Sequence, residues 1–182
     1  MPGSLMSDQE LQVRSTVLWF TGLSGAGKTT LATELKKQLK RKGVRVYLLD
    51  GDQLRSGLNA DLGFAKEDRS ENIRRAAEVA KLLCDEGYYV LATFISPFEA
   101  DRAIARRIIG SDRFKEIFVQ CPLSVCEQRD VKGLYKKARA GMLMQFTGID
   151  SPYEEPKISD ITIHSNEQSI EESVNLILKR LL

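Results

Sequence analysis

Apolar residues follow two alternating patterns along this chain. Five short apolar runs, rich in β-branched and aromatic residues, predict β-strands at 17–20, 44–50, 88–95, 117–119 and 161–163. Between them, helical periodicity and helix-start signals predict helices at 28–42, 66–86, from 96 onward, 123–129 and 169–182. Because strands alternate with helices, we expect an α/β fold in which a five-stranded parallel sheet lies between two layers of helices.

Composition and charge narrow the class of protein. The 182 residues are 42% apolar and 29% charged, which is typical of one soluble domain with a full core. We therefore expect a single domain at 13–182 and a flexible N-terminal segment at 1–12, whose first residues we interpret as a cloning remnant. The net charge of +2 is too small to suggest nucleic acid or membrane partners, and no apolar run approaches the ~20 residues that span a bilayer. Three cysteines without metal-ligand spacing indicate reduced thiols in a cytoplasmic protein.

A glycine-rich segment between the first strand and the first helix has a phosphate-binding pattern. Gly22-Leu-Ser-Gly-Ala-Gly-Lys28-Thr29-Thr30 places two glycines, a lysine and a hydroxyl residue at the required spacing. The backbone N–H groups of such a loop surround a polyphosphate at a helix N-terminus, where the helix dipole favours negative charge. Lys28 would reach the β- and γ-phosphates, and the Thr29 hydroxyl would contact Mg²⁺. The pattern predicts a fold of the P-loop NTPase type.

Two aspartates follow the second predicted strand. We expect Asp50 and Asp52 to lie on an extended segment, so that their side chains point the same way. Ligands of open α/β sheets bind beyond the carboxyl ends of the strands, which places both aspartates beside the loop. An aspartate there can hold Mg²⁺ through water or take the proton of an acceptor hydroxyl, and both carboxylates are candidates. A turn that merely contains two aspartates is the alternative.

The helix predicted at 66–86 has polar residues where its apolar face should continue. Extending that face backward by one turn reaches Arg69 and Asn72. Because an inward, unpaired arginine is costly, an anionic ligand at this end of the helix would explain both residues. The alternative is an Arg69 that pairs with Asp68 or Glu71 on a solvated first turn.

Two further segments have both a structural and a functional interpretation. Ser96-Pro97-x-Glu99 has the form of a capping box, so Ser96 either begins a helix or contacts a ligand beside the loop. The segment 129–139 holds five cations and resembles the mobile lid of small-molecule kinases, which brings positive charge over the transferring phosphates. A solvated basic helix is the alternative for the second segment.

Several blocks of sequence after the loop carry a family resemblance. They are Leu49-Asp-Gly-Asp52 with Arg55, Gly57-Leu-Asn59, Leu62-Gly-Phe64, Glu67-Asp-Arg69, Glu71-Asn-Ile-Arg-Arg75, Phe94-Ile-Ser-Pro97, Asp101-Arg102, the segment 126–141 and Phe146-Thr-Gly-Ile-Asp-Ser-Pro-Tyr-Glu154. In this order and spacing, from about 17 to 163, the chain resembles the adenylylsulfate kinase (APS kinase) family. The resemblance implies a P-loop kinase domain with a helical lid.

The resemblance also implies a reaction and a set of site residues. ATP and adenosine 5′-phosphosulfate (APS) would give ADP and 3′-phosphoadenosine 5′-phosphosulfate by direct in-line transfer with Mg²⁺, in a homodimer. Lys28, Asp52 and Asp50 would be catalytic, and Thr29 and, through water, Asp50 would hold the metal. The residues implied for ATP are Gly22, Ser24, Gly25, Ala26, Gly27, Lys28, Thr29, Thr30 and Arg129. Those implied for APS are Asp52, Arg55, Phe64, Arg69, Asn72, Ile95, Ser96, Lys132, Gln145 and Phe146, with both phenylalanines stacked on its adenine.

Other nucleotide-binding functions remain as alternatives. Another small-molecule P-loop kinase would act on a nucleoside monophosphate or a sugar acid. A GTP-binding switch is suggested by Asp130-Val-Lys-Gly133, but the chain contains no Asn-Lys-x-Asp guanine motif. A nucleotide-binding module without catalysis is disfavoured because Lys28, Thr29 and both aspartates are present.

Overall fold

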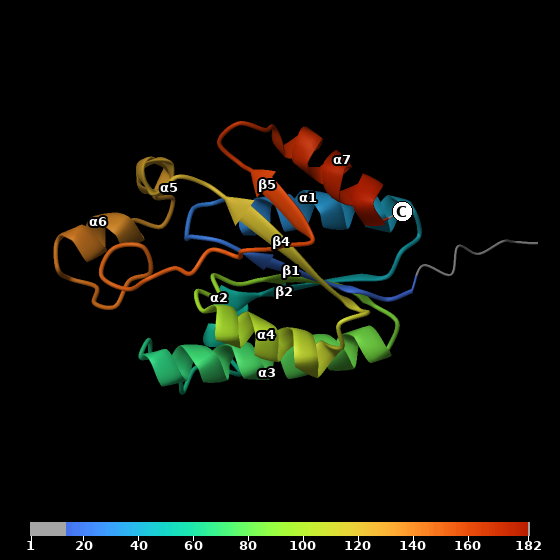
Figure 1. Ribbon diagram of the computed structural model, residues 1–182, viewed down its shortest axis with the longest axis horizontal. Helices are drawn as coiled ribbons and strands as arrows, with labels where there is room; N and C mark the ends of the chain where they lie inside the picture. Colours follow the sequence, from blue (N-terminus) through green and yellow to red (C-terminus); the bar gives the residue numbers. More distant parts are fainter. Residues whose placement is uncertain (1–13, 182) are drawn as a thin grey trace, which may run out of the picture.

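Five parallel strands form the centre of the molecule in the computed structural model, which describes residues 14–181 (Figure 1). The strands are β1 (Val17–Thr21), β2 (Val46–Asp50), β3 (Tyr89–Thr93), β4 (Phe114–Gln120) and β5 (Ile161–His164). Their order across the sheet is β2-β3-β1-β4-β5. The predicted five-stranded parallel sheet is therefore confirmed, whereas the predicted N-terminal segment 1–12 lies outside the described residues.

Two pairs of helices cover the two faces of the sheet, as Figure 1 shows. One pair is α1 (Lys28–Arg41) and α7 (Ile170–Leu181), and the other is α3 (Lys66–Asp85) and α4 (Glu99–Ile109). The central strand β1 serves both cores because its side chains alternate between the faces. Leu18 and Phe20 pack with α1 and α7, whereas Val17 and Trp19 pack with α3 and α4. This is the predicted three-layer α/β arrangement.

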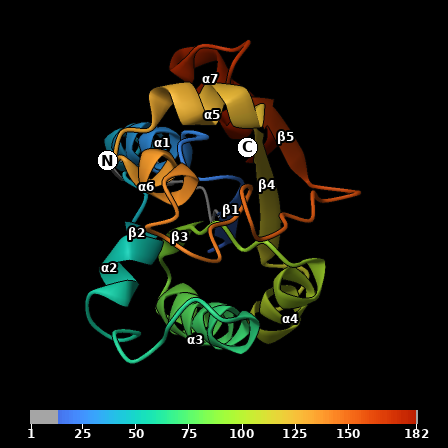
Figure 2. The same ribbon diagram turned by 90° about the vertical axis from the view of Figure 1, so that its left-hand side faces the viewer.

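Three short helices lie beyond the carboxyl ends of the strands: α2 (Gly51–Arg55), α5 (Leu123–Arg129) and α6 (Leu134–Arg139). Figure 2 looks onto this edge, with α5 and α6 on one side and α2 and α3 on the other. We call residues 129–141, which include α6, the lid segment. Within residues 14–181, no helix combines the length and the apolar character needed to cross a membrane.

The structure corrects two local predictions. Residues 50–52 are not one extended segment, because β2 ends at Asp50 and α2 begins at Gly51. The side chain of Asp50 caps this helix by accepting a hydrogen bond from the Asp52 N–H at 3.0 Å. The helix after β3 begins at Glu99 and follows Phe98, so Ser96 is not its N-cap.

Candidate active site

A cavity of about 840 Å³ lies at the carboxyl edge of the sheet, between the phosphate-binding loop, α2, the first turns of α3 and the lid segment. All of the predicted site residues line this cavity except Gly22. From the ATP set these are Ser24, Gly25, Ala26, Gly27, Lys28, Thr29, Thr30 and Arg129. From the set implied for APS they are Asp52, Arg55, Phe64, Arg69, Asn72, Ile95, Ser96, Lys132, Gln145 and Phe146. Asp50 also lines the cavity. One cavity thus brings together residues from seven segments that are far apart in sequence.

The loop before α1 presents an uncapped helix N-terminus to the cavity. Gly27 precedes the helix with a φ of 104°, and within the described chain no side chain caps that end. Gly22 is required by close packing, because a Cβ at this position would lie 2.5 Å from the carbonyl oxygen of Val119. The free N–H groups and the helix dipole form an anion-binding site.

Lys28 is buried against the loop that it belongs to. Its Nζ donates hydrogen bonds to the carbonyl oxygens of Gly22 at 2.8 Å and Leu23 at 2.7 Å. Burial lowers the pKa of Lys28 to about 8, although the charges of Asp52 and Asp50 act in the opposite direction. The ammonium group is therefore held by neutral carbonyls, next to the point where a polyphosphate would lie.

Asp50 is held firmly at the end of β2. One of its oxygens accepts hydrogen bonds from the hydroxyls of Thr29 at 2.9 Å and Thr93 at 2.8 Å, while the other caps α2. Partial burial alone would raise the pKa of Asp50, but these hydrogen bonds together lower it below its usual value. An ionised carboxylate beside a threonine hydroxyl fits the hard oxygen ligands that Mg²⁺ prefers.

Asp52 has a different environment from Asp50. It lies in the first turn of α2, its side chain is 72% exposed, and it forms an ion pair with Lys132 of the lid segment. This pair bridges the cavity from α2 to the lid segment. Asp50 is thus occupied by two hydroxyls and a helix cap, whereas Asp52 is exposed at the cavity and contacts the lid segment.

The inward position of Arg69 and Asn72 is confirmed, since they are 8% and 6% exposed. Arg69 donates to the Phe64 carbonyl and the Thr147 hydroxyl, both at 2.9 Å, and also to the Gln145 carbonyl. The alternative pairing with Asp68 or Glu71 is therefore wrong.

Two arginines from different helices lie close together on this side of the cavity. Burial and then the positive charge of Arg55 lower the pKa of Arg69. The Arg55 guanidinium lies over the ring of Phe64, with 4.5 Å from its Cζ to the ring centroid. Phe64 is half exposed, whereas Phe146 is buried with its edge against Tyr135. Two neighbouring cations beside aromatic rings favour a ligand that is both anionic and planar.

Comparison with known proteins identifies the family. The family model for adenylylsulphate kinase matches residues 14–164. The chain belongs to the adenylylsulphate kinase family. It is 53% identical over 174 residues to an adenylyl-sulfate kinase of Clostridium acetobutylicum, covering 96% of this chain and 86% of that protein. It is 56% identical over 168 residues to a probable adenylyl-sulfate kinase of Bacillus subtilis, covering 92% and 84%.

A solved structure supports the same assignment. The structure of the Mycobacterium tuberculosis APS kinase CysC in complex with AMPPNP and APS matches with a TM-score of 0.89 and 49% identity. The match covers 92% of this chain and 98% of that one. The α/β fold of this chain is thus that of the P-loop kinases, as the loop sequence predicts.

Ser96 lines the cavity, but its hydroxyl belongs to a buried network of hydrogen bonds. Its Oγ accepts a hydrogen bond from the Trp19 indole at 3.2 Å and donates one to the Thr21 hydroxyl at 2.9 Å. The capping box is wrong because the cap of α4 comes from elsewhere: the Glu154 carboxylate accepts from the Glu99 N–H at 2.7 Å. A side chain that is 55 residues away replaces the local cap that the spacing suggested.

Three residues that support the site do not emerge from the sequence analysis. Thr93 holds Asp50, Thr147 holds Arg69, and the Tyr135 hydroxyl donates to the Ser24 carbonyl of the loop at 2.8 Å. Thr93 could have been predicted from the sequence, because it is a polar residue at the end of an apolar strand. Thr147 and Tyr135 could not, since only the folded chain brings them to their partners.

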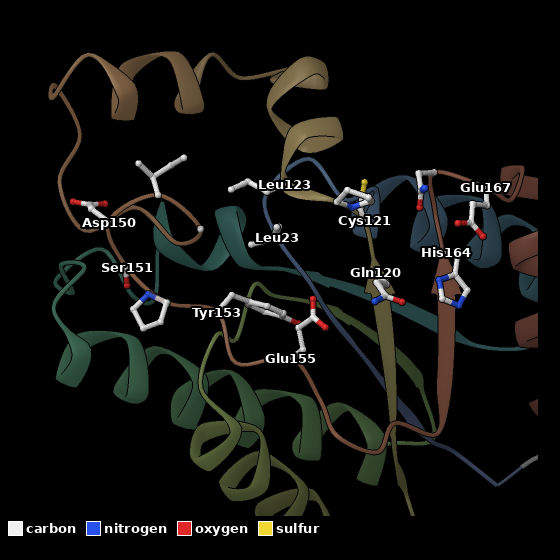
Figure 3. Close-up of a pocket in the computed structure, with 15 residues that line it drawn as sticks. Leu23, Gln120, Cys121, Leu123, Asp150, Ser151, Tyr153, Glu155, His164 and Glu167 are labelled. Carbon is white, nitrogen blue, oxygen red and sulfur yellow. The ribbon is translucent and has the colours of Figure 1, made fainter.

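A second cavity of about 810 Å³ lies on the other side of the loop (Figure 3). Leu23 of the loop, Leu123 and Tyr153 form part of its apolar wall, and Glu155 and Glu167 lie at its rim. Among the 15 residues that line it there is no lysine or arginine. This cavity therefore lacks the positive side chains that bind a polyphosphate, whereas the first cavity has several.

The environment of Lys28 predicts that ATP binding to this chain depends on pH. In the free protein Lys28 loses its charge as the pH rises through about 8. A polyphosphate favours the charged form, so the Kd for ATP should be constant just below pH 8 and rise above it. Because one proton is involved, the Kd for ATP can rise by at most about tenfold per pH unit. Titration calorimetry at pH 7.5, 8.5 and 9.5 measures the effect.

Lys28→Arg is the matched control for this dependence, because a guanidinium stays charged throughout this range. The rise in Kd should disappear in that variant. A Kd that rises equally in both proteins would assign the dependence to another group.

Proposed function

We propose that this chain transfers the γ-phosphoryl group of ATP to the 3′-hydroxyl of APS, which yields ADP and 3′-phosphoadenosine 5′-phosphosulfate. The observation that carries the proposal is that the Lys28–Thr29 loop and the Arg55–Arg69 pair face one cavity. The cavity can therefore hold a triphosphate and a second anionic nucleotide next to each other. The relative from M. tuberculosis, whose structure contains AMPPNP and APS, supports this pair of substrates.

The loop and α1 hold the donor. The N–H groups of Gly25–Thr30 bind the phosphates, and Lys28 moves from the Gly22 and Leu23 carbonyls to the β- and γ-phosphates. Arg129, which donates to the Gly25 carbonyl at 3.2 Å, lies where it can contact the nucleotide. Thr29 and, through water, Asp50 would hold Mg²⁺, which when bound neutralises charge on the phosphates.

The opposite side of the cavity holds the acceptor. Arg55, Arg69 and Asn72 bind its anionic groups, and Phe64 and Phe146 contact its adenine. Ile95, Ser96, Lys132 and Gln145 complete the acceptor site. Ser96 contributes through its backbone, because its hydroxyl is occupied by Trp19 and Thr21.

The transfer itself needs positioning and charge neutralisation more than covalent chemistry. As the bond from the γ-phosphorus to the leaving ADP oxygen breaks, a bond to the 3′-oxygen forms, and the hydroxyl proton passes to Asp52. Lys132 and Arg129 place positive charge over the phosphates, and the lid segment excludes water. A direct transfer of this kind requires no phosphorylated Ser96.

Comparison of acceptors tests the proposed function. ADP release with Mg²⁺ and ATP should be at least about a hundredfold more efficient, in kcat/KM, with APS than with AMP or gluconate, since AMP lacks the sulfate group and gluconate lacks the nucleoside. A coupled ADP assay measures all three. Equal efficiencies would favour another small-molecule kinase, and a strict requirement for GTP in place of ATP would favour a GTP-binding protein.

We also propose that the protein is a cytoplasmic homodimer. The three cysteines are free and buried, which suits a reducing compartment. Light scattering tests the dimer, since it should give twice the 20.4 kDa of one chain. Cell fractionation tests the compartment.

A further inference from the structure

The backbone at Ser96 has an unusual conformation at the acceptor end of the cavity. Its φ is 42°, in the left-handed region that side chains other than glycine rarely adopt. Such a conformation persists only where the surroundings determine it. Here the Ser96 carbonyl accepts a hydrogen bond from Arg102 at 2.8 Å, and the Thr21 hydroxyl donates to the neighbouring Ile95 carbonyl at 2.7 Å.

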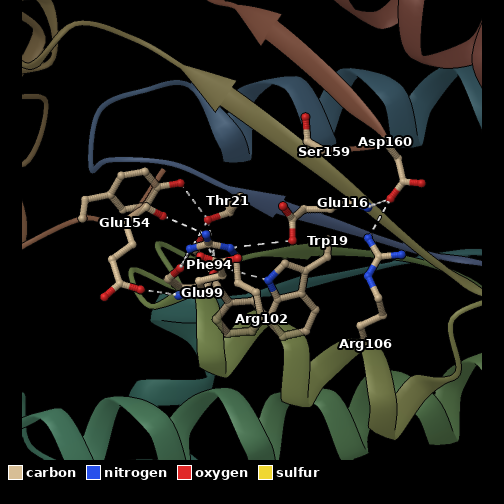
Figure 4. A network of polar contacts seen from close by, with 12 residues as sticks. Trp19, Thr21, Phe94, Glu99, Arg102, Arg106, Glu116, Glu154, Ser159 and Asp160 are labelled. Atoms are coloured by element: carbon tan, nitrogen blue, oxygen red, sulfur yellow. Dashed lines mark hydrogen bonds and ion pairs between the residues drawn. The ribbon is translucent and has the colours of Figure 1, made fainter. Parts of the chain in front are cut away.

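Arg102 joins Ser96 to a segment that is distant in sequence. Its Nη2 donates to the Glu154 carbonyl at 2.7 Å, while its Nη1 donates to Ser96. The Glu154 N–H donates to the Pro97 carbonyl at 2.8 Å, so the two segments are linked at several points. Figure 4 shows the guanidinium of Arg102 between Thr21, Glu154 and Glu116.

The far end of the Glu154 segment carries the adenine side of the proposed acceptor site. Asp150 accepts hydrogen bonds from the N–H groups of Gln145 at 2.7 Å and Phe146 at 2.6 Å. The Gly148 N–H donates to the Ser151 carbonyl at 2.8 Å. Residues 145–151 therefore form one hydrogen-bonded turn, with Gln145 and Phe146 at the cavity, and two residues of chain join this turn to Glu154 at Arg102.

The shape and charge of the Arg102 side chain explain how one residue can hold both segments. It is 2% exposed, and its Nε lies 3.7 Å from an oxygen of Glu116, which is also buried. A planar guanidinium can donate to two carbonyls and face a carboxylate at once, whereas an ammonium group lacks this fixed fork. Arg102 does not line the cavity.

We propose that Arg102 is a positioning residue for the acceptor: it fixes the spacing between Ile95–Ser96 and Gln145–Phe146. This inference rests on the proposed function, in which those two segments hold APS. The donor nucleotide is held by the loop and α1, which Arg102 does not contact. A change at Arg102 therefore acts on the binding of APS and leaves the binding of ATP nearly unchanged.

Arg102→Lys tests the proposal, because lysine keeps the charge beside Glu116 but cannot reach both carbonyls. The KM for APS should rise at least about tenfold, while the KM for ATP stays within about twofold. Arg106→Lys is the matched control, since Arg106 lies one turn further along α4 and pairs with Asp160 at 2.9 Å. That variant should keep both KM values.

A second variant tests the proposal if Arg102→Lys does not fold. The double variant Arg102→Met with Glu116→Gln removes both buried charges and should show the same rise in the KM for APS alone. Folded variants whose KM for APS is unchanged, or whose two KM values rise equally, would overturn the positioning role. A wild-type protein that releases no ADP with APS would instead refute the proposed function.

Discussion

Replacing Lys28 by alanine is expected to lower kcat/KM for APS-dependent ADP release by more than a hundredfold, which corresponds to about 2.7 kcal/mol of transition-state stabilisation. The variant loses the cation at the β- and γ-phosphates, where charge develops during transfer. It also loses the hydrogen bonds from Nζ to the Gly22 and Leu23 carbonyls that hold the loop. The coupled ADP assay at saturating Mg²⁺ gives the value.

Lys40→Ala is the matched control for Lys28→Ala. Lys40 is an exposed lysine in the last turn of the same helix, so the same substitution there should leave turnover unchanged. Circular dichroism checks that both variants are folded. If Lys28→Ala kept more than about a hundredth of the wild-type efficiency, the assigned role of Lys28 would be wrong.

Replacing Asp52 by asparagine is expected to lower kcat by about 10²–10⁴-fold, the usual contribution of a general base. The amide has nearly the shape of the carboxylate but cannot take the proton of the 3′-hydroxyl. Because the loop and the arginines are untouched, the KM values for ATP and APS should change little. Steady-state kinetics with each substrate varied in turn separates these effects.

Two variants serve as controls for Asp52→Asn. Lys132→Gln breaks the same ion pair but keeps the carboxylate, so it should raise the KM for APS and lower kcat less than Asp52→Asn does. Asp50→Asn keeps a helix cap and should mainly raise the Mg²⁺ concentration that turnover requires. If instead Asp50→Asn abolished turnover and Asp52→Asn did not, the base would be Asp50.

Local periodicity predicted the parts of the fold and the site that depend on neighbouring residues. Strand and helix positions follow from short-range patterns, and the inward turn of Arg69 and Asn72 follows from the 3.6-residue repeat of α3. The phosphate-binding loop is likewise local, because its glycines, Lys28 and Thr29 lie within nine residues.

Parts of the site that depend on distant partners were predicted wrongly or missed. Ser96 has the spacing of a capping box, yet hydrogen bonds with Trp19, Thr21 and Arg102 hold it in a different conformation. The error at Asp50 and Asp52 was avoidable, since an aspartate before a glycine and a second aspartate is also a helix-start signal. The contacts of Thr147 with Arg69 and of Tyr135 with Ser24 join residues that are far apart in sequence, so they could not be predicted from spacing.

The long-range cap on α4 affects the order in which parts of the protein fold during synthesis. Glu154 follows Glu99 by 55 residues, so a nascent chain that has just released α4 from the ribosome lacks the carboxylate that completes its first turn. At that point β4 and β5, which complete the sheet, and α7, which packs with α1, have not emerged either. The first turn of α4 can therefore gain its cap only when translation has passed residue 154.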